Sequence, residues 1–512
     1  MYGVTGNVLI LDLEQKSSRV ESISEDISSQ WLGGAGLCVH LLSRFGDEDR
    51  LAILAPGLLT GTGTLASCSS FLVGRGTPGK EPAFAVIKDH FGAELKYAGF
   101  DAIVLYGQSV EPLYLQIGPD GPKFLSARHL WNMTTEDAER SIREQAPDPW
   151  TGREMQILSI GPAGEHLAAL AGLVVNGWNV AGSRGLGQVF GESKLKAVSI
   201  TGSKSLKLAK PGPFLRSVSN QIATLKNSKK RLQLNEKGPI AYYQALAEGG
   251  MLQQEDRGVP EDFLSRVMGK KACFSCPVGC LKWMRTSHGE GFLPEGDSFL
   301  AALGDFPGEP SAPEVLTAYW ECTRNGLDFP SFLATLRLAG ELYGAGRLDL
   351  DDLGWPLPKN WQETASIVDR IGRERKQGCL LSQECRELMD WADPDAPLQI
   401  NEFMYPGLSW EKLPRTRQYL GTGGSRSDTV NMLAMTDDLD WKTGLDQDPG
   451  TLGWGMHLLG VCHFAAPVLD LEALYESAGL ALGIDLSPEL VRKAAERTEK
   501  ELHQSAGEPA EA

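Results

Sequence analysis

The segment KKACFSCPVGCLKWM, residues 270–284, places three cysteines within eight positions of a 512-residue chain that has nine cysteines in all. Cys273, Cys276 and Cys280 have the spacing C-x2-C-x3-C, with Pro277 and Gly279 between the second and the third. Proline and glycine favour a tight turn, whose backbone amides can point toward sulfur atoms. Such a turn can present several thiolates to one metal centre, and the rest of the chain must then supply any further ligand.

Three interpretations compete for this spacing. The cysteines can be small core residues, although three within eight positions around a turn are unusual for a core. A zinc site would use a second pair of cysteines or histidines, and only His288 lies nearby. A [4Fe–4S] cluster takes four thiolates, and the fourth can come from far along the chain. We therefore predict a [4Fe–4S] cluster.

The fourth sulfur must come from the cysteines outside the motif. They are Cys38, Cys68, Cys322, Cys379, Cys385 and Cys462. Cys462 lies in the apolar segment HLLGVCHFAAP, with a glycine shortly before it and a proline shortly after it. Cys379 and Cys385 flank a polar segment instead. Spacing alone makes Cys462 the first choice without excluding the others.

The composition is that of a folded protein with a strong negative charge. The chain has 42% apolar residues and a formal net charge of −17. No basic stripe stands out, so we expect no nucleic acid among the partners. No window holds the roughly 20 uninterrupted apolar residues of a membrane span, and the start MYGVTGNVLILDLEQ reads as a strand rather than a secretory signal. Scattered cysteines suit a reducing compartment, and we expect a cytoplasmic protein.

Hydrophobic patterning divides the chain into a β-rich part and a helical part. Up to about residue 204, short apolar runs such as RLAILAPG and MQILSIGPAG end at Gly or Pro. Farther on, apolar residues fall at helical spacing and strand signals almost disappear. We predict an α+β protein with a β-rich domain at 1–204, a helical domain at 205–405 that carries the cysteine motif, and a helical domain at 406–512 that carries the fourth cluster cysteine.

Several segments, in this order, resemble the tungsten-dependent aldehyde:ferredoxin oxidoreductases. They are MYGVTGNVLILDL, WLGGAGLCVHLL, FGAELKYAGFDAIVLYG, ILSIGPAGE, GLGQVFGESKLKAV, CFSCPVGC, CTRNGLD and GVCHF, and they run through nearly the whole chain. The resemblance implies that the β-rich domain is a pterin-type domain, which binds a tungsten or molybdenum bis-pterin, and that two helical lobes complete the site. It also implies that Cys273, Cys276, Cys280 and Cys462 hold the [4Fe–4S] cluster.

The same resemblance carries further site residues onto this chain. It implies cofactor-binding roles for Arg184, Gly185, Gly187, Lys194, Gly326, Asp328 and Asp428. The alternative, that Arg184 and Lys194 are ordinary surface charges, stays open. A family glutamate that follows the cysteine motif would fall on Asp297 in LPEGDSF, with Glu295 two positions before it, and both are candidate catalytic carboxylates. A turn or a helix cap at EGDS is the competing interpretation.

Five departures from the family pattern concern the pterin side of the site. Lys88 and Asp89 stand where the family has a glycine pair, and Ser183 stands where it has an arginine. Thr429 replaces a histidine to which the family assigns proton transfer, and threonine cannot titrate near neutral pH. His457 replaces an acidic residue, and LASCSSFLVG lacks the basic residue that often meets a pterin phosphate.

We predict an oxidoreductase that acts on the aldehyde or oxo group of a small-molecule substrate. A metal bis-pterin would perform the chemistry, and the cluster would pass electrons to ferredoxin or to an iron–sulfur partner subunit. Alternatively, the chain has lost the pterin and serves as an electron-transfer or scaffold subunit of a larger redox complex. A third possibility is the active subunit of a complex similar to the aryl-CoA reductases, and we expect an oligomer. NAD or FAD binding is not expected, because GGAGLC and GSRGLG lack the G-x-G-x-x-G spacing.

Overall fold

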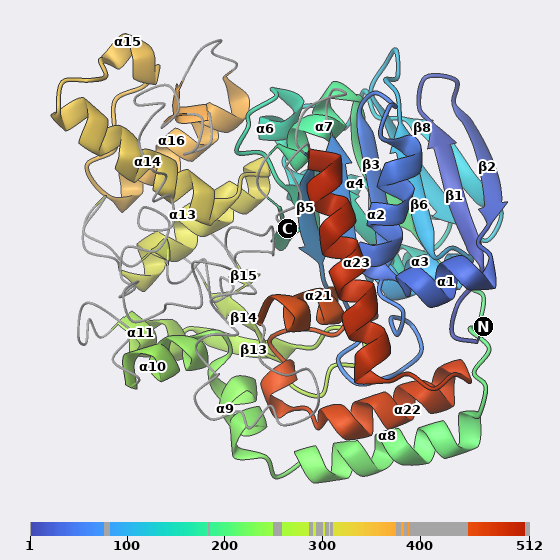
Figure 1. The fold of residues 1–512 in the computed structure, drawn as a ribbon. Helices are drawn as coiled ribbons and strands as arrows, with labels where there is room; N and C mark the ends of the chain where they lie inside the picture. The colour runs from blue at the N-terminus through green and yellow to red at the C-terminus, as the bar shows by residue number, and fades with distance from the viewer. Residues whose placement is uncertain are drawn as a thin grey trace.

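The computed structural model describes most of the chain. The described residues are 2–75, 82–182, 185–248, 259–285, 290–292, 301–302, 307, 311–374, 380–382, 388 and 449–506. Two six-stranded sheets lie in the N-terminal part, and helices from the rest of the chain surround them (Figure 1). The architecture is α+β, as the sequence predicted.

The first sheet has the strand order β2-β1-β6-β3-β4-β5. Its strands are β1 (Asn7–Asp12), β2 (Ser17–Ser22), β3 (Leu51–Pro56), β4 (Ser70–Arg75), β5 (Ala83–Ile87) and β6 (Ala102–Tyr106). Strands β1 and β6 run parallel, and the other neighbours are antiparallel. Side chains alternate along β1, so that Val8 and Ile10 join one apolar cluster and Leu9 and Leu11 join another. Both faces of this sheet are therefore buried.

The second sheet has the strand order β11-β10-β9-β12-β7-β8. Its strands are β7 (Leu113–Gly118), β8 (Gly121–Ser126), β9 (Gln156–Ser159), β10 (Leu173–Val175), β11 (Asn179–Ala181) and β12 (Leu195–Ile200). Strands β7 and β12 run parallel, and the other neighbours are antiparallel. Leu9 and Ile103 of the first sheet share one apolar core with Leu115 and Leu158 of the second. The two sheets thus form a single β-rich unit.

Short helices connect these strands. They are α1 (Glu25–Trp31), α2 (Gly34–Phe45), α3 (Phe91–Ala98), α4 (Thr135–Glu144), α5 (Pro149–Glu154), α6 (Pro162–Glu165) and α7 (Leu186–Glu192). Thr134 caps α4, because its side chain accepts a hydrogen bond from the backbone N–H of Asp137. Helix α3 ends at Gly99, whose left-handed φ of 107° glycine adopts without strain.

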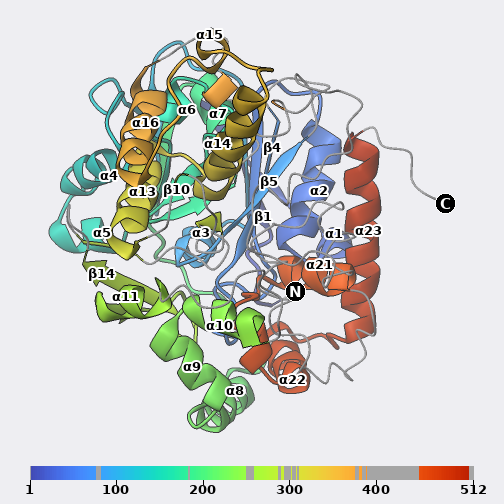
Figure 2. The same ribbon diagram turned by 90° about the vertical axis from the view of Figure 1, so that its left-hand side faces the viewer.

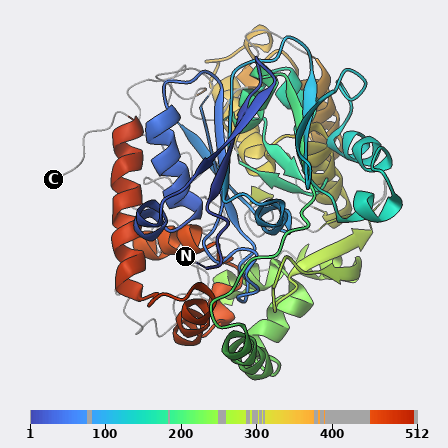
Figure 3. The same ribbon diagram turned by 90° about the vertical axis from the view of Figure 1, so that its right-hand side faces the viewer.

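Helices dominate the part of the chain after residue 204 that the structure describes. They are α8 (Pro211–Leu225), α9 (Lys229–Lys237), α10 (Ile240–Glu248), α11 (Val259–Ser265), α13 (Ala312–Asn325), α14 (Phe329–Gly344), α15 (Leu350–Leu353), α16 (Trp361–Arg373), α21 (Pro449–Leu459), α22 (Leu471–Leu482) and α23 (Pro488–Ala506). Helices α13, α14 and α16 share one apolar core with residues of α10 and α11 and with the segment that follows α6. Helices α21 and α23 pack against α2 and the first sheet (Figures 2 and 3). No described helix is long and apolar enough to cross a membrane. The domain boundaries near 204 and 405 stay predictions.

A third, three-stranded antiparallel sheet lies among the helices. It contains β13 (Val267–Lys271), β14 (Leu281–Arg285) and β15 (Glu290–Phe292). The sequence predicts almost no strands here, and that prediction is wrong for these segments. Lysine and arginine interrupt the apolar residues of VMGKK and LKWMR and hide the strand pattern. The cysteine motif is the connection between β13 and β14, so a hairpin presents its sulfur atoms.

Candidate metal centre and active site

The cysteine motif forms a tightly held loop. The backbone N–H of Cys276 donates to the carbonyl of Cys273 at 3.1 Å, and Gly279 has a φ of 63°, which the turn requires. The fully buried ammonium of Lys282 donates to the carbonyl of Cys280 at 3.0 Å, and burial lowers the pKa of Lys282 to about 8. The Asn235 side chain on α9 donates to the Val278 carbonyl at 2.6 Å. The loop is therefore fixed from both sides.

A segment of the N-terminal domain links this loop to Cys462. The N–H of Ala66 donates to the carbonyl of Ser275 at 2.8 Å, and the N–H of Cys462 donates to the carbonyl of Ala66 at 3.0 Å. Cys68, two residues farther along this segment, is 1% exposed and Cys462 is 6% exposed. Both belong to one apolar cluster against which the three motif cysteines pack. Five cysteines thus come together from three distant parts of the sequence.

The five sulfur atoms are not equivalent. Burial first, and then the proximity of Cys273 and Cys462, raises the pKa of the Cys276 thiol to about 12. Burial, followed by Cys276, Cys462 and Cys273, also raises the pKa of Cys280. Hydrogen bonds to Cys273 and Cys462 raise the pKa of Cys68, whose nearest sulfurs are these two. Cys462 therefore faces the whole motif, whereas Cys68 borders one side of it.

The cysteines that come together here are candidate ligands of one metal group. Within the described ranges, no group of three or more His, Cys, Asp or Glu side chains is placed to hold a metal ion. A zinc site would draw four donors to about 2.3 Å from one ion. In a [4Fe–4S] cubane each thiolate binds a separate iron corner, so that the sulfurs stand farther apart around a larger group. Four buried or half-buried cysteines that meet from two distant segments fit a group with four thiolate ligands, and the choice between a zinc ion and a [4Fe–4S] cluster stays a prediction.

The position of the family's glycine pair holds two buried charged side chains. Asp89 is 1% exposed and has a φ of 82°, a conformation that few residues other than glycine adopt. Its carboxylate accepts from the Asn176 amide at 2.8 Å and from the Lys271 ammonium at 2.9 Å. The ammonium of the buried Lys88 lies 4.7 Å from the ring centroid of Phe464. The backbone keeps a glycine geometry, but side chains now occupy the adjacent space, so these residues do not fit a bis-pterin that needs bare backbone.

Three glycines with predicted cofactor roles have packing roles in the structure. Gly185 has a φ of 76° at the start of α7. A Cβ on Gly187 would lie 2.7 Å from the carbonyl oxygen of Gly172. Gly326 ends α13 with a φ of 73°, and a Cβ there would lie 2.6 Å from the backbone nitrogen of Gly161. These glycines allow backbone segments to cross closely, and their cofactor roles stay predictions.

The remaining predicted residues are distributed differently. Asp328 caps α14 by accepting from the N–H of Ser331 at 3.0 Å. Lys194 donates from its ammonium to the carbonyl of Val110 at 2.6 Å, away from the cysteines. Outside the described residues lie Ser183, Arg184, Glu295, Asp297, Asp428 and Thr429. The two candidate catalytic carboxylates therefore stay predictions.

His457, which stands at a family acidic position, lies in an aromatic cluster. It is 4% exposed, and its ring centroid lies 4.7 Å from that of His463 and 5.5 Å from that of Phe71. Trp454 meets the same ring edge-on at 6.0 Å. An acidic side chain here would be surrounded by aromatic rings. The histidine instead packs against these rings at a position where the family has a charged carboxylate.

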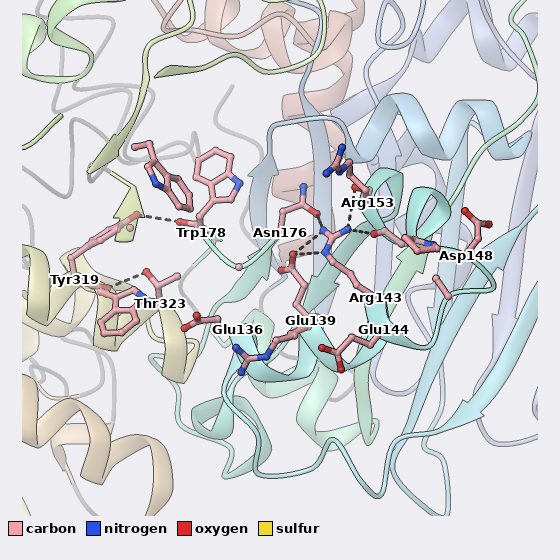
Figure 4. A pocket seen from close by; sticks show the side chains of 18 of the residues that line it. Glu136, Glu139, Arg143, Glu144, Asp148, Arg153, Asn176, Trp178, Tyr319 and Thr323 are labelled. Atoms are coloured by element: carbon pink, nitrogen blue, oxygen red, sulfur yellow. Dashed lines mark hydrogen bonds and ion pairs between the residues drawn. The ribbon is translucent and has the colours of Figure 1, made fainter. Parts of the chain in front are cut away.

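A cavity of about 770 Å³ lies between the N-terminal unit and α13. Helices α4 and α5, the turn between β10 and β11, α13 and the third sheet line it. Figure 4 shows Glu139 and Arg143 on one side and Trp178 and Tyr319 on the other. Asn176 lines the cavity and also donates to Asp89, so the cavity adjoins the glycine-pair position. Its size suits a small organic molecule.

Sequence reasoning missed this cavity, because its residues come from five separate segments. Glu139 belongs to a helix that reads as an ordinary polar surface helix. The Arg143 guanidinium donates to the Glu139 carboxylate at 2.8 Å, yet burial outweighs this contact and raises the pKa of Glu139. A carboxyl group with a raised pKa, beside aromatic walls, can both bind a polar group and hold a proton.

We expect Glu139→Gln to change how stability depends on pH. Because the pKa of Glu139 is raised in the folded state, its contribution is complete at low pH and is lost as the pH rises through that pKa. The free energy of unfolding of the wild type should therefore fall relative to that of Glu139→Gln as the pH rises above the ordinary range of a glutamate pKa. Urea unfolding at several pH values measures this, with the exposed Glu144→Gln on the same helix as control. A constant difference would contradict the prediction.

Comparison with known proteins identifies the family. The pattern described as "Aldehyde ferredoxin oxidoreductase, N-terminal domain" matches residues 8–202, and the pattern for "domains 2 & 3" matches residues 234–400. These two matches define the protein as an oxidoreductase. The chain belongs to the aldehyde ferredoxin oxidoreductase family, of which it is a divergent member.

Similar proteins come from Thermococcus and Pyrococcus species. The tungsten-containing aldehyde ferredoxin oxidoreductase of Thermococcus kodakarensis is 28% identical over 97% of this chain and 87% of its own length. The protein of the same name from Pyrococcus furiosus is 29% identical over 83% and 72%. The WOR-like subunit of an aliphatic sulfonate oxidoreductase from Pyrococcus furiosus is 26% identical over 72% and 64%.

A solved structure has the same fold. It is the active-site complex BamBC of benzoyl coenzyme A reductase with bound 1,5-dienoyl-CoA, with a TM-score of 0.76 and 18% identity. The match covers 99% of this chain and 89% of the other. At this identity the likeness shows the fold alone.

Proposed function

We propose that this chain is an oxidoreductase in which a [4Fe–4S] cluster, held by Cys273, Cys276, Cys280 and Cys462, transfers electrons. The observation that carries the proposal is the convergence of these four cysteines on one buried apolar cluster. When bound, the cluster accepts and returns one electron at a time. The Ala66 backbone links its two ligand segments, and Lys282 anchors the motif loop.

The surroundings of the cysteines suit electron transfer between interior and surface. Cys273 and Cys276 are half-buried, and both line a surface groove. Cys462 lies on the inner side, two residues before the buried Phe464. A cluster at this place would be shielded from bulk water on one side and close to a partner on the other. Both conditions favour rapid transfer of electrons to or from an external protein.

The family supports one form of this oxidoreductase. Two relatives are by name tungsten-containing, and by analogy this chain would hold a tungsten or molybdenum bis-pterin. In this form a small molecule with an aldehyde or oxo group is the substrate, and ferredoxin or an iron–sulfur partner subunit accepts the electrons. The cavity beside Asn176 would admit the substrate.

The residues at the glycine-pair position favour a second form, which we prefer. The buried carboxylate of Asp89 and the buried Lys88 occupy space that a pterin would need as bare backbone. In this form the chain lacks the pterin and is an electron-transferring subunit of a larger redox complex. The naming of one relative as a subunit, and the complex that contains the similar structure, support this assembly.

Metal analysis separates the two forms. We expect protein produced with added tungstate and molybdate, and purified without oxygen, to contain iron but neither heavy metal. The Thermococcus kodakarensis relative, produced in the same way, is the positive control for incorporation. One tungsten or molybdenum per chain would contradict the pterin-free form, while the proposal for the cluster would remain.

A further inference from the structure

A surface groove of about 540 Å³ lies directly over the cysteine motif. Cys273, Cys276 and Pro277 form one side, and α8 forms the other through Val218 and Ile222. The guanidinium of Arg231, at the start of α9, donates to the carbonyls of Leu225 and Pro277. The corner between α8 and α9 is therefore attached to the motif loop, so a protein that binds this corner contacts the edge of the cluster site.

Helix α8 presents an apolar stripe beside this groove. Leu215 is 62% exposed and Ile222 is 50% exposed, and each lies about one turn from Val218 on the same helix face. Only Phe214 and Leu225 of α8 are buried, and the helix packs against α22 along the lower edge of the molecule in Figure 1. Large apolar side chains at this exposure, next to a groove, are typical of interaction surfaces.

The charge of this corner is opposite to that of the rest of the protein. Residues 215–231 contain five lysines and arginines and no Asp or Glu, whereas the whole chain has a net charge of −17. Lys226 lines the groove, and Lys229 is exposed at the start of α9. Exposed carboxylates of Glu472 and Glu476 lie on the neighbouring α22, so the positive surface does not continue onto that helix. The sequence pattern does not reveal this surface, because five charges spread over 17 residues do not form a run.

We propose that this corner, formed by residues 215–231 and the groove over Cys273 and Cys276, docks a small acidic protein that carries a one-electron redox centre. The inference rests on the proposed cluster and adds the surface and the charge of its partner. In each encounter the partner's centre loses or gains one electron and the cluster gains or loses it. A small groove with a charged rim fits the weak, short-lived complexes of electron transfer.

The test uses the complete protein and a charge reversal at the corner. Reduced acidic plant-type ferredoxin is mixed with the oxidised protein by stopped flow, and the rate of ferredoxin oxidation is followed. Lys226→Glu/Lys229→Glu should lower this rate about tenfold or more at low salt, and the deficit should shrink as salt is added. The matched control, Lys123→Glu/Lys359→Glu, makes the same change in net charge at exposed positions elsewhere and should leave the rate near that of the wild type.

Further measurements identify the reason for any change. Basic cytochrome c should react faster with the corner variant than with the wild type. An electrically neutral viologen should reduce all variants at equal rates. Ile222→Ser should slow ferredoxin oxidation without changing the salt dependence, because it alters the apolar stripe and leaves the charge of the corner unchanged. Equal ferredoxin rates for the corner and control variants would overturn the proposal. A wild type that forms dimers, dissociated by the corner variant, would also overturn it in favour of a second copy of this chain.

Failure of this inference is distinguishable from failure of the proposed function. If the wild type holds no iron and does not react with the neutral viologen, the cluster itself is absent. If iron and the viologen reaction are normal but charge reversal has no effect, only the docking surface is wrong.

Discussion

Cys276→Ser is expected to remove most of the iron and the visible absorbance of the protein and to abolish electron transfer to a viologen dye. Cys276 lies in the centre of the motif loop, beside Cys273 and Cys462. A serine oxygen is a much harder ligand than a thiolate, and iron–sulfur clusters select soft thiolates. The loop should otherwise persist, since its hydrogen bonds are made by backbone atoms and by Asn235 and Lys282.

Cys68→Ser is the matched control for this prediction. Cys68 is more deeply buried than Cys276 and hydrogen-bonds to two of the proposed ligands, yet it borders only one side of the group. The control should therefore retain its iron. Retained iron in Cys276→Ser would contradict the ligand set. Loss of iron in Cys68→Ser, together with retention in Cys462→Ser, would make Cys68 the fourth ligand instead.

Lys196→Met is expected to cost about 3–5 kcal/mol of stability, because it leaves a buried carboxylate without its partner. Lys196 on β12 and Glu165 on α6 form an ion pair whose side chains are both fully buried. Burial raises the pKa of Glu165 and lowers the pKa of Lys196, in each case against the attraction of the partner. The Lys196 ammonium also donates to the carbonyl of Met133, and Glu165 accepts from the N–H of Asn132.

The double variant Lys196→Met/Glu165→Gln tests the reason for that loss. It removes both charges and keeps an acceptor for Asn132, so it should regain much of the lost stability. The deficit of the single variant should also shrink at low pH, where Glu165 becomes protonated. The free energy of the first unfolding transition in urea, measured without oxygen, gives both quantities. A double variant as unstable as the single one would show that packing, rather than the unpaired charge, is responsible.

Much of the fold could be predicted from local sequence signals. Thr134 and Gly99 mark helix ends because capping depends on a few neighbouring atoms. The strands β13 and β14 were missed because their pairing partner, rather than their composition, defines them. Nor does any pattern along the chain reveal that two separate six-stranded sheets share one core. Periodicity shows which residues are buried, but not against which element.

The candidate site, like the fold, could be predicted where local sequence signals exist and not where distant segments meet. The motif cysteines could be found by spacing, and Cys462 by its apolar context and the family resemblance. Cys68 was only one of six candidates for the fourth ligand, because its proximity to the motif cysteines depends on the Ala66 hydrogen bonds between distant segments. Asp89 could be recognised as a departure, but its left-handed φ and its contact with Lys271 required three-dimensional geometry. The cavity beside Glu139 left no local signal at all.

The most direct test of the central claim is the count of iron and inorganic sulfide per chain in wild-type protein purified without oxygen. We predict four irons and four sulfides, with an electron paramagnetic resonance signal after reduction by dithionite that is typical of a [4Fe–4S] cluster. A single zinc ion per chain, or no metal with all five neighbouring thiols free to react with a thiol reagent, would contradict the account.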